Sequence, residues 1–457
     1  MTTHMIFPRH ISRRGIAALL ILISPIGLHA QQAWTLEQCC DYAVAHNITI
    51  KQRDNQREQE EIQLSTARNR RLPDLNASIG ENLSFGRGLT ADNTYSNTNT
   101  SNTSFSLSTS VPLFTGFEIP NQIRLSRLNL EAATQDLEKA KNDIRLQVAQ
   151  AYVQVLYDME IVDVARRQTS IDSAQVARLQ ALLDVGRASR AELSQQQATL
   201  AQSHLTVTQA ANNLQLALLS LSQLLELESP EGFTIVRPGP GTDGPAGAVA
   251  AIGGNTGSPD DIFSAALASR PEIQSEQIRL KASERSINIA RAALYPTLSF
   301  SAGMGTNYYT TSGFSADPFG RQLKNNFSQY LGLNLNIPIF SRFSTQNSIR
   351  TARLNRLNQQ LVLDNAKKTL YKEIQQAWYN TMTAIDKLNS SNEARLASED
   401  AFRLTQAKYE QGKATITEFN EMKNNLMKTE SDLTQARYEY LYQTAILKFY
   451  RGEPLRF

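Results

Sequence analysis

Two glutamates near the C-terminal end of the chain are the acidic residues whose spacing most resembles a functional pair. Glu418 and Glu421 lie three positions apart in a segment predicted to be helical, so their carboxylates share one helix face. Carboxylates gathered in this way attract cations and repel anions. Solvated acids on an ordinary helix surface give the same spacing, and the residues alone leave both interpretations open.

The chain lacks the residue groups that carry out catalysis in other proteins. Of five histidines, His4, His10 and His29 fall within the first thirty residues, and His46 and His204 each stand alone on a predicted helix. The sequence contains no clustered metal ligands, no phosphate-binding loop and no nucleophile elbow. We therefore expect no enzyme activity, no cofactor and no bound metal.

Residues 1–30 form an expected secretory signal peptide. Arg9, Arg13 and Arg14 precede an apolar run at 16–26, and cleavage is expected after about Ala30. These arginines are the only charged residues of the segment and account for the formal net charge of +3, so the remaining chain is neutral. A neutral chain without basic runs argues against nucleic acid as a partner.

The two cysteines of the chain, Cys39 and Cys40, are adjacent and lie inside a predicted helix. Adjacent cysteines make no disulfide framework, so we expect small buried apolar side chains. Both lie well beyond the expected cleavage point, and the chain is therefore not expected to be a lipoprotein.

The rest of the chain is an internal duplication. Leu72-Pro73 matches Tyr295-Pro296, and Val111-Pro112-Leu113-Phe114 matches Ile337-Pro338-Ile339-Phe340. Two glycine-centred segments, 185–189 and 411–415, match in the same way. The predicted organisation is a first repeat over 31–228, a linker or equatorial region over 229–260, and a second repeat over 261–457.

Each repeat holds two segments in which apolar and small polar residues alternate, which indicates strands at about 74–86, 103–112, 297–309 and 327–338. A half-buried sheet in a water-soluble protein shows the same alternation. The polar positions here are nearly all Ser, Asn and Gly, and the connecting segments 86–103 and 310–326 are long and polar, which favours membrane-spanning strands with external loops. Four strands cannot close a barrel, so several copies must share one, and strand counting alone allows two copies or three.

Long helices are predicted for the remainder of each repeat. After Pro120 no Gly or Pro occurs before Gly186, and on the order of 60 residues at ~1.5 Å each span roughly 90 Å. The returning segment from Ser189 to Leu227 is equally uninterrupted. Such lengths favour antiparallel coiled coils in a rod or tube over an ordinary helical bundle.

This order of a helix, two strands, a long helix, a turn and a returning helix, given twice, resembles the TolC family of outer-membrane efflux proteins. The resemblance runs from Trp34 to Phe457 and depends on the paired proline landmarks and the two glycine turns. It implies an internally duplicated α+β membrane protein: a trimeric 12-stranded transmembrane β-barrel, with four strands per protomer, continued by a long antiparallel α-helical periplasmic tunnel.

The resemblance also implies where the protein acts and with what. We expect a homotrimer in the outer membrane of a Gram-negative bacterium, in contact with outer-membrane lipid and docked to a periplasmic adaptor (membrane fusion) protein and an inner-membrane pump of the RND or ABC type. The expected function is the passive exit duct of a tripartite efflux system for drugs or other small molecules. A type I protein secretion duct is the alternative with the same fold, and a periplasmic coiled-coil adaptor or scaffold is the alternative of another class.

By the same resemblance, the two glycine-centred turns lie at the periplasmic tip of the tunnel and dock the adaptor. Independently of the resemblance, glycine adopts the left-handed conformation that ends a helix, and a following Ser or Thr caps the next one. The implied docking residues are Val185, Gly186, Arg187, Ser189, Gln411, Gly412, Lys413 and Thr415.

The resemblance finally implies a periplasmic gate. Glu418 and Glu421 fall where relatives carry an acidic ring that narrows the tunnel, and Glu192 takes the corresponding place in the first repeat. Tyr409 matches a tyrosine that helps to hold the tip closed in some relatives, whereas Ala414 stands where they have an arginine, with Lys413 beside it. The predicted gate therefore consists of Glu418, Glu421, Glu192 and Tyr409.

Overall fold

Two copies of one folding unit make up the chain. The computed structural model describes residues 33–89, 92–237 and 258–455, so the expected signal peptide and residues 238–257 of the expected linker lie outside the described part. The first copy comprises α1 (Leu36–His46), α2 (Ile48–Asn69), β1 (Asn76–Leu89), β2 (Tyr95–Thr115), α3 (Glu118–Asp184) and α4 (Arg190–Leu224). The second comprises α6 (Pro259–Ser269), α7 (Pro271–Ala292), β3 (Thr297–Thr311), α8 (Phe319–Asn325), β4 (Ser328–Asn336), α9 (Ser344–Glu410) and α10 (Ile416–Tyr450).

Matching helices of the two copies have equal lengths. α1 and α6 have 11 residues each, α2 and α7 have 22, α3 and α9 have 67, and α4 and α10 have 35. α8 lies in the connection between β3 and β4. The duplicated sequence therefore folds twice into the same succession of helices.

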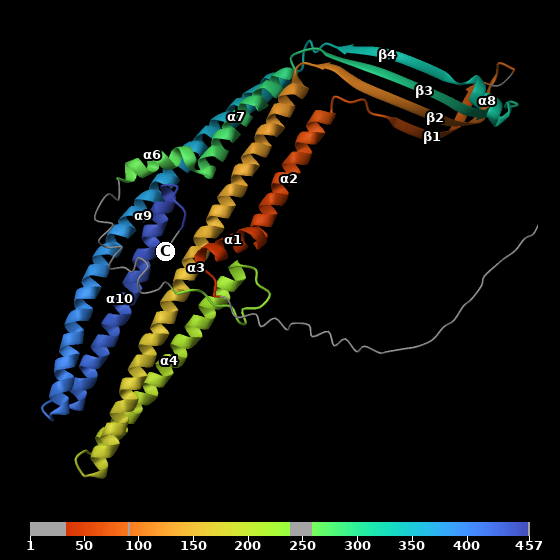
Figure 1. Ribbon diagram of the computed structural model, residues 1–457. Helices are drawn as coiled ribbons and strands as arrows, with labels where there is room; N and C mark the ends of the chain where they lie inside the picture. Colours follow the sequence, from red (N-terminus) through yellow and green to blue (C-terminus); the bar gives the residue numbers. More distant parts are fainter. Residues whose placement is uncertain (1–32, 90–91, 238–257, 456–457) are drawn as a thin grey trace, which may run out of the picture.

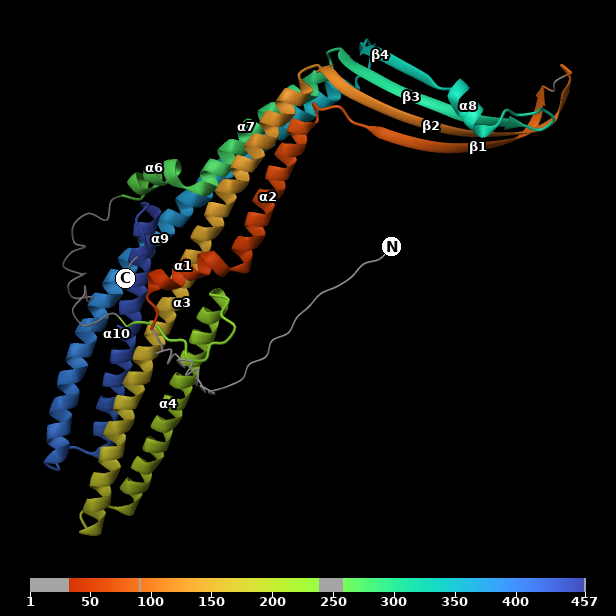
Figure 2. The same cartoon turned by 45° about the vertical axis from the view of Figure 1, so that its right-hand side comes forward.

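The molecule is elongated, with a sheet at one end and two helical hairpins at the other (Figure 1). The sheet is antiparallel, with the strand order β1-β2-β3-β4. The hairpins are α3 with α4 and α9 with α10, and α10 also packs along α3. Figure 2 shows the same separation of sheet and hairpins from a second direction.

The strands reach further than the alternation predicts in one place and less far in another. Residues 86–103, expected to form a loop, contain the end of β1 and the start of β2, where Arg87 pairs with Asn97 and Leu89 with Tyr95. Apart from Leu89 and Tyr95, the paired residues of this segment are glycine or polar at both alternating positions, so the segment gives no period-two signal, although its backbone continues the ladder. β4 ends at Asn336, two residues before the predicted end, and the second expected loop contains α8.

Above the hairpins, four helices lie side by side in the order α2, α3, α7 and α9 (Figure 1). Each continues one strand of the sheet, so the helical layer extends the sheet. The lower hairpin helices meet this layer end to end: Asn47 Nδ2 donates to the Leu224 carbonyl at 3.1 Å, which joins the end of α4 to the start of α2. Arg270 Nη2 donates to the Phe449 carbonyl at 2.7 Å, which joins α10 to α7 in the same way.

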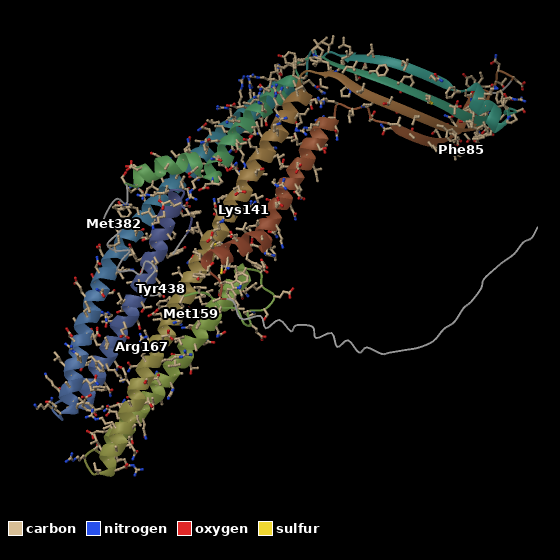
Figure 3. All side chains as sticks on the ribbon, in the orientation of Figure 1. Phe85, Lys141, Met159, Arg167, Met382 and Tyr438 are labelled. Atoms are coloured by element: carbon tan, nitrogen blue, oxygen red, sulfur yellow. The ribbon has the colours of Figure 1, made fainter. Side chains whose placement is uncertain are left out.

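The largest apolar core lies where α1, α3, α4 and α10 meet. It includes Val148, Leu221, Tyr438 and both cysteines, Cys39 and Cys40, and Tyr438 appears in the middle of the helical part in Figure 3. The cysteines are free and buried, as the sequence predicts. Burial raises the pKa of both thiols to about 12. None of the helices in the described part of the chain combines the length and the hydropathy that a membrane-spanning helix needs.

Candidate tunnel wall and tip

The sheet has one apolar face and one polar face, and the register of its strands makes each face continuous. On the apolar face, Ile79 pairs with Phe105, Leu107 with Met304 and Ala302 with Leu331. These side chains are open to the surroundings, since Ile79 is 75% exposed and Leu331 is 79% exposed. Such a face is stable next to lipid and unfavourable next to water.

The opposite face carries small polar residues. Ser78 pairs with Ser106, with their hydroxyl oxygens 2.6 Å apart, and Ser108 pairs with Gly303. The ring of Tyr330 lies across Gly303, where an added Cβ would come within 2.6 Å of a ring carbon. This face can line a water-filled lumen.

Glu81 is a charge in the middle of the apolar row of β1. Ser101 donates to its carboxylate at 2.6 Å, and Thr103 donates to the other carboxylate oxygen. Both hydroxyls come from β2 on the same face. The apolar rows of β2 and β3 also give way to Thr103 and Thr306 near this level, whereas Leu83 and Phe85 continue the apolar row of β1 beyond Glu81.

At the far end of the molecule, the two hairpin turns have the same backbone geometry. Gly186 has φ +75° and Gly412 has φ +73°, and a Cβ added to either would meet nothing within 4 Å. Gly186 N–H donates to the Leu183 carbonyl at 2.9 Å, and Gly412 N–H donates to the Tyr409 carbonyl at 3.0 Å. The backbone conformation, not space, therefore requires glycine here.

Two of the predicted gate glutamates belong to helix caps. Ser189 Oγ accepts from Glu192 N–H at 3.1 Å, and the Glu192 carboxylate accepts from Ser189 N–H at 2.9 Å. Thr415 and Glu418 make the same reciprocal pair, at 3.2 and 2.8 Å. Each pair is a capping box that satisfies two N–H groups at the start of a helix. The carboxylates of Glu418 and Glu192 are thus held by backbone N–H groups at the starts of their own helices.

Glu421 lies nearly one turn beyond Glu418 and is exposed. Its carboxylate projects from the same side of α10, as the spacing of three predicts. Among the predicted gate acids it is the one that the capping boxes do not include.

Tyr409 connects the two hairpins close to their tips. Gln175 of α3 donates to its hydroxyl, and the guanidinium of Arg178, also on α3, lies 5.0 Å from the ring centroid. The ring also stacks on Phe419 of α10, with the two ring centroids 5.1 Å apart. Burial is the main cause that raises the pKa of Tyr409 above its ordinary value.

The remaining predicted docking residues lie at the surface of the turns. Val185 is 68% exposed, and Arg187, Gln411 and Lys413 are exposed as well. Each turn thus presents one base, Arg187 or Lys413, directly after its glycine.

A buried polar cluster above the tips is the main feature that the sequence reading missed. We call it the Asp172 cluster. Asp172 is 0% exposed and Lys423 is 1% exposed, and their side chains form an ion pair between α3 and α10. The cluster consists of Asp172, Lys423, Gln168, Gln196, Ser203 and Asn420.

The Asp172 carboxylate has partners on each helix around it. Gln196 of α4 donates to it at 3.1 Å, Gln168 of its own helix donates at 3.3 Å, and Ser203 of α4 donates as well. Asn420 of α10 in turn donates to Gln196 Oε1 at 3.1 Å. The cluster therefore ties the first hairpin to α10 through groups removed from water.

One signal in the sequence could have indicated Lys423. Ile416 and Phe419 are buried at spacings of three and four from one another and from position 423, so Lys423 occupies an apolar position of the helix stripe. A charge at such a position needs a buried partner. The partner of Lys423 could not be predicted from the sequence, because Asp172 is 251 residues away from Lys423 in the chain.

In the described part of the chain, no group of three or more His, Cys, Asp or Glu side chains could hold a metal ion.

Comparisons with known proteins agree with the architecture. A family model described as outer membrane efflux protein matches residues 41–226 and 262–453. The chain is 22% identical over 441 residues to outer membrane protein TolC of Escherichia coli, covering 95% of this chain and 86% of that protein. It is 28% identical over 284 residues to the fusaric acid resistance protein FusA of Burkholderia cepacia, covering 60% of this chain and 49%, about half, of that protein.

Solved structures share the fold. The Campylobacter jejuni CmeC outer membrane channel matches with a TM-score of 0.73 at 19% identity, over 92% of this chain and 87% of that chain. The outer membrane protein VceC of Vibrio cholerae matches with a TM-score of 0.72 at 15% identity, over 92% of this chain and 97% of that chain.

Proposed function

Since the chain belongs to the outer membrane efflux protein family, we propose that three copies of it form the outer-membrane exit duct of a tripartite efflux system for small molecules. The observation that carries the proposal is the sheet with one continuous apolar face and one polar face, extended by the layer of α2, α3, α7 and α9. Three copies make a 12-stranded barrel and a helical tunnel below it. The part of the predicted fold class that one chain can show, four strands and two long antiparallel helical hairpins in an internal duplication, is confirmed.

The duct is a passive conduit in this proposal. Its polar lining of Ser, Asn and Gly offers water-like contacts without strong binding, which suits passage of varied solutes. Energy for transport comes from an inner-membrane pump, of the RND or ABC type, reached through a periplasmic adaptor. The chain itself carries no catalytic step.

The tips are proposed as the gate and the docking site. In a trimer each acidic position is repeated three times around the tunnel axis, so Glu421 supplies a ring of carboxylates that favours cations. Glu418 and Glu192 cap the first turn of their own helices. Neutralising either of them therefore mainly weakens the helix cap, and changes the electrostatic field in the tunnel less. Arg187 and Lys413 offer the adaptor two basic contacts per protomer.

Deletion and fractionation together test the function. A strain that lacks this protein is expected to become sensitive to a panel of toxic small molecules, and expression of the wild-type protein is expected to restore resistance. The expressed protein is expected in the outer-membrane fraction, as a heat-modifiable trimer. If deletion instead abolishes export of one polypeptide and leaves sensitivity unchanged, the duct serves type I secretion. Recovery as a soluble periplasmic protein would support the adaptor alternative.

A further inference from the structure

Within the described residues of one chain, both edge strands of the sheet, β1 and β4, lack a neighbour on their outer side. A sheet in lipid must close, because unpaired backbone groups at an open edge are costly there. In the trimer, β4 therefore lies next to β1 of a neighbouring copy. The register of that pairing decides which side chains meet at the seam between copies.

Because the two repeats are equivalent, the register of a strand pair in one repeat predicts the register of the equivalent pair in the other. The pairs β1–β2 and β3–β4, both inside one chain, test this prediction. Asn76 is the third residue after Pro73, and Ser108 is the fourth before Pro112. The equivalent residues of the second repeat, counted from Pro296 and Pro338, are Ser299 and Asn334. Asn76 pairs with Ser108, and Ser299 pairs with Asn334.

The pairing of β1 with β2 is thus reproduced in β3 with β4 without a shift. The prolines that begin and end the strand pairs are therefore reliable reference points for register. The duplication also relates the pairing of β2 with β3, which lies inside the chain, to the pairing of β4 with β1, which lies between copies.

Ser108 pairs with Gly303, which is the seventh residue after Pro296. The equivalent of Ser108 is Asn334, and the equivalent of Gly303 is Gly80, the seventh residue after Pro73. We propose that β4 pairs with β1 of the neighbouring copy in the register that sets Asn334 opposite Gly80. Asn336 then lies opposite Ser78, and Ser328 lies opposite Gly86.

The chemistry of the seam fits this register on both faces. On the apolar face, Leu331 meets Leu83 of the neighbouring copy and Leu335 meets Ile79, four side chains that are each more than half exposed in the single chain. Leu333, which lies between Leu331 and Leu335 on this face, comes opposite Glu81. On the polar face, Tyr330 meets Ser84, a small partner for a large ring. A slip of one residue would turn the apolar residues of β4 toward the polar face of β1.

The register also accounts for the unequal lengths of the two edge strands. β1 has 14 residues and β4 has 9. In this register the first residue of β4, Ser328, lies opposite Gly86, so the end of β1 from Arg87 to Leu89 extends beyond β4. Residues at the end of α8 lie there: Asn326 Nδ2 donates to the Asn307 carbonyl at 2.8 Å, and Gln322 binds both backbone groups of Tyr309. α8 therefore takes the place of β4 in the upper wall, between β3 and β1 of the neighbouring copy.

A slip of two residues keeps the faces and is the rival arrangement, so the test must separate registers two apart. Directly opposite Cβ atoms in an antiparallel pair are about 4.5–5.5 Å apart, whereas diagonal neighbours are about 7–8 Å apart, and a disulfide requires about 3.5–4.5 Å. In a Cys39→Ala, Cys40→Ala background, Asn336→Cys is combined in turn with Ser78→Cys, Asn76→Cys or Gly80→Cys. All these positions lie on the polar face of the full-length trimer.

Mild oxidation is expected to link neighbouring chains several-fold faster with Ser78→Cys than with either of the other two, as dimers and trimers on a non-reducing denaturing gel. Faster linkage with Asn76→Cys or Gly80→Cys would overturn the register, and so would the absence of linkage in all three assembled trimers. If a variant does not assemble, a second set of pairs tests the register independently. Tyr330→Cys is combined with Ser84→Cys, its partner in the proposed register, or with Asn82→Cys, its partner after a slip of two residues. Assembly on a native gel separates a wrong register from the failure of the trimer itself.

Discussion

Replacing Lys423 with methionine would remove the positive charge of the Asp172 cluster and keep nearly the same side-chain length. Asp172 would then remain 0% exposed without the ammonium that faces it. Breaking a buried ion pair at one partner costs about 3–5 kcal/mol. Because Gln168, Gln196 and Ser203 still donate to the carboxylate, we expect the lower end, about 3 kcal/mol or roughly 100-fold in an opening equilibrium.

The effect should appear where α10 packs on α3. Native-state amide hydrogen exchange of the assembled trimer measures it directly, as faster exchange along residues 416–430 and in the facing part of α3. A double variant, Lys423→Met with Asp172→Leu, removes both charges and is expected to recover most of the protection.

The matched control is the neighbouring ion pair between the same helices. Arg167 Nη2 lies 3.7 Å from Glu430 Oε2, with the two side chains 56% and 31% exposed, and Arg167 is labelled on α3 in Figure 3. Exposed pairs of this kind contribute about 0–1 kcal/mol, so Arg167→Met should leave exchange nearly unchanged. Equal exchange in Lys423→Met and the wild type would refute the importance of the buried cluster.

Three further perturbations address the tip and the core. Glu421→Gln is expected to lower the preference of single channels for cations over anions, whereas Glu418→Gln should mainly weaken the helix cap; an unchanged ion preference in Glu421→Gln would remove it from the gate. Gly412→Ala places a Cβ on a residue with φ +73° and should lower the stability of the hairpin turn by about 1 kcal/mol, measured by protease sensitivity at the turn; equal cleavage would contradict the left-handed conformation. Cys39 and Cys40, whose pKa values burial raises to about 12, should resist alkylation by iodoacetamide at pH 8 in the folded protein and react after denaturation, and rapid labelling of the native protein would show that they are accessible.

The parts of the fold that could be predicted from the sequence are those set by local chemistry. The glycine turns at 186 and 412, the uninterrupted long helices and the strand alternation each follow from residues close together in the chain. The two capping boxes can be predicted as well, from Ser189 with Glu192 and from Thr415 with Glu418, whereas the resemblance implies a gate role for the same glutamates. Whether these glutamates also act in a gate stays a prediction.

The missed features depend on residues that are far apart in the chain or on weak patterns. Lys423 and Asp172 meet only because the two repeats fold against each other. The start of β2 carries Ser, Thr and Asn on both faces, and the end of β1 that pairs with it is Gly86-Arg87-Gly88-Leu89, so their pairing leaves no hydrophobic period to detect. The partners of Glu81 could not be predicted either, because its donors, Ser101 and Thr103, belong to the next strand.

Single-channel recording in a planar lipid bilayer tests the central claim most directly. Full-length trimer purified from outer membranes should insert and give discrete, uniform conductance steps that favour cations over anions. A trimer that inserts into the bilayer without any conductance step would contradict the assignment of this chain as the wall of a continuous duct.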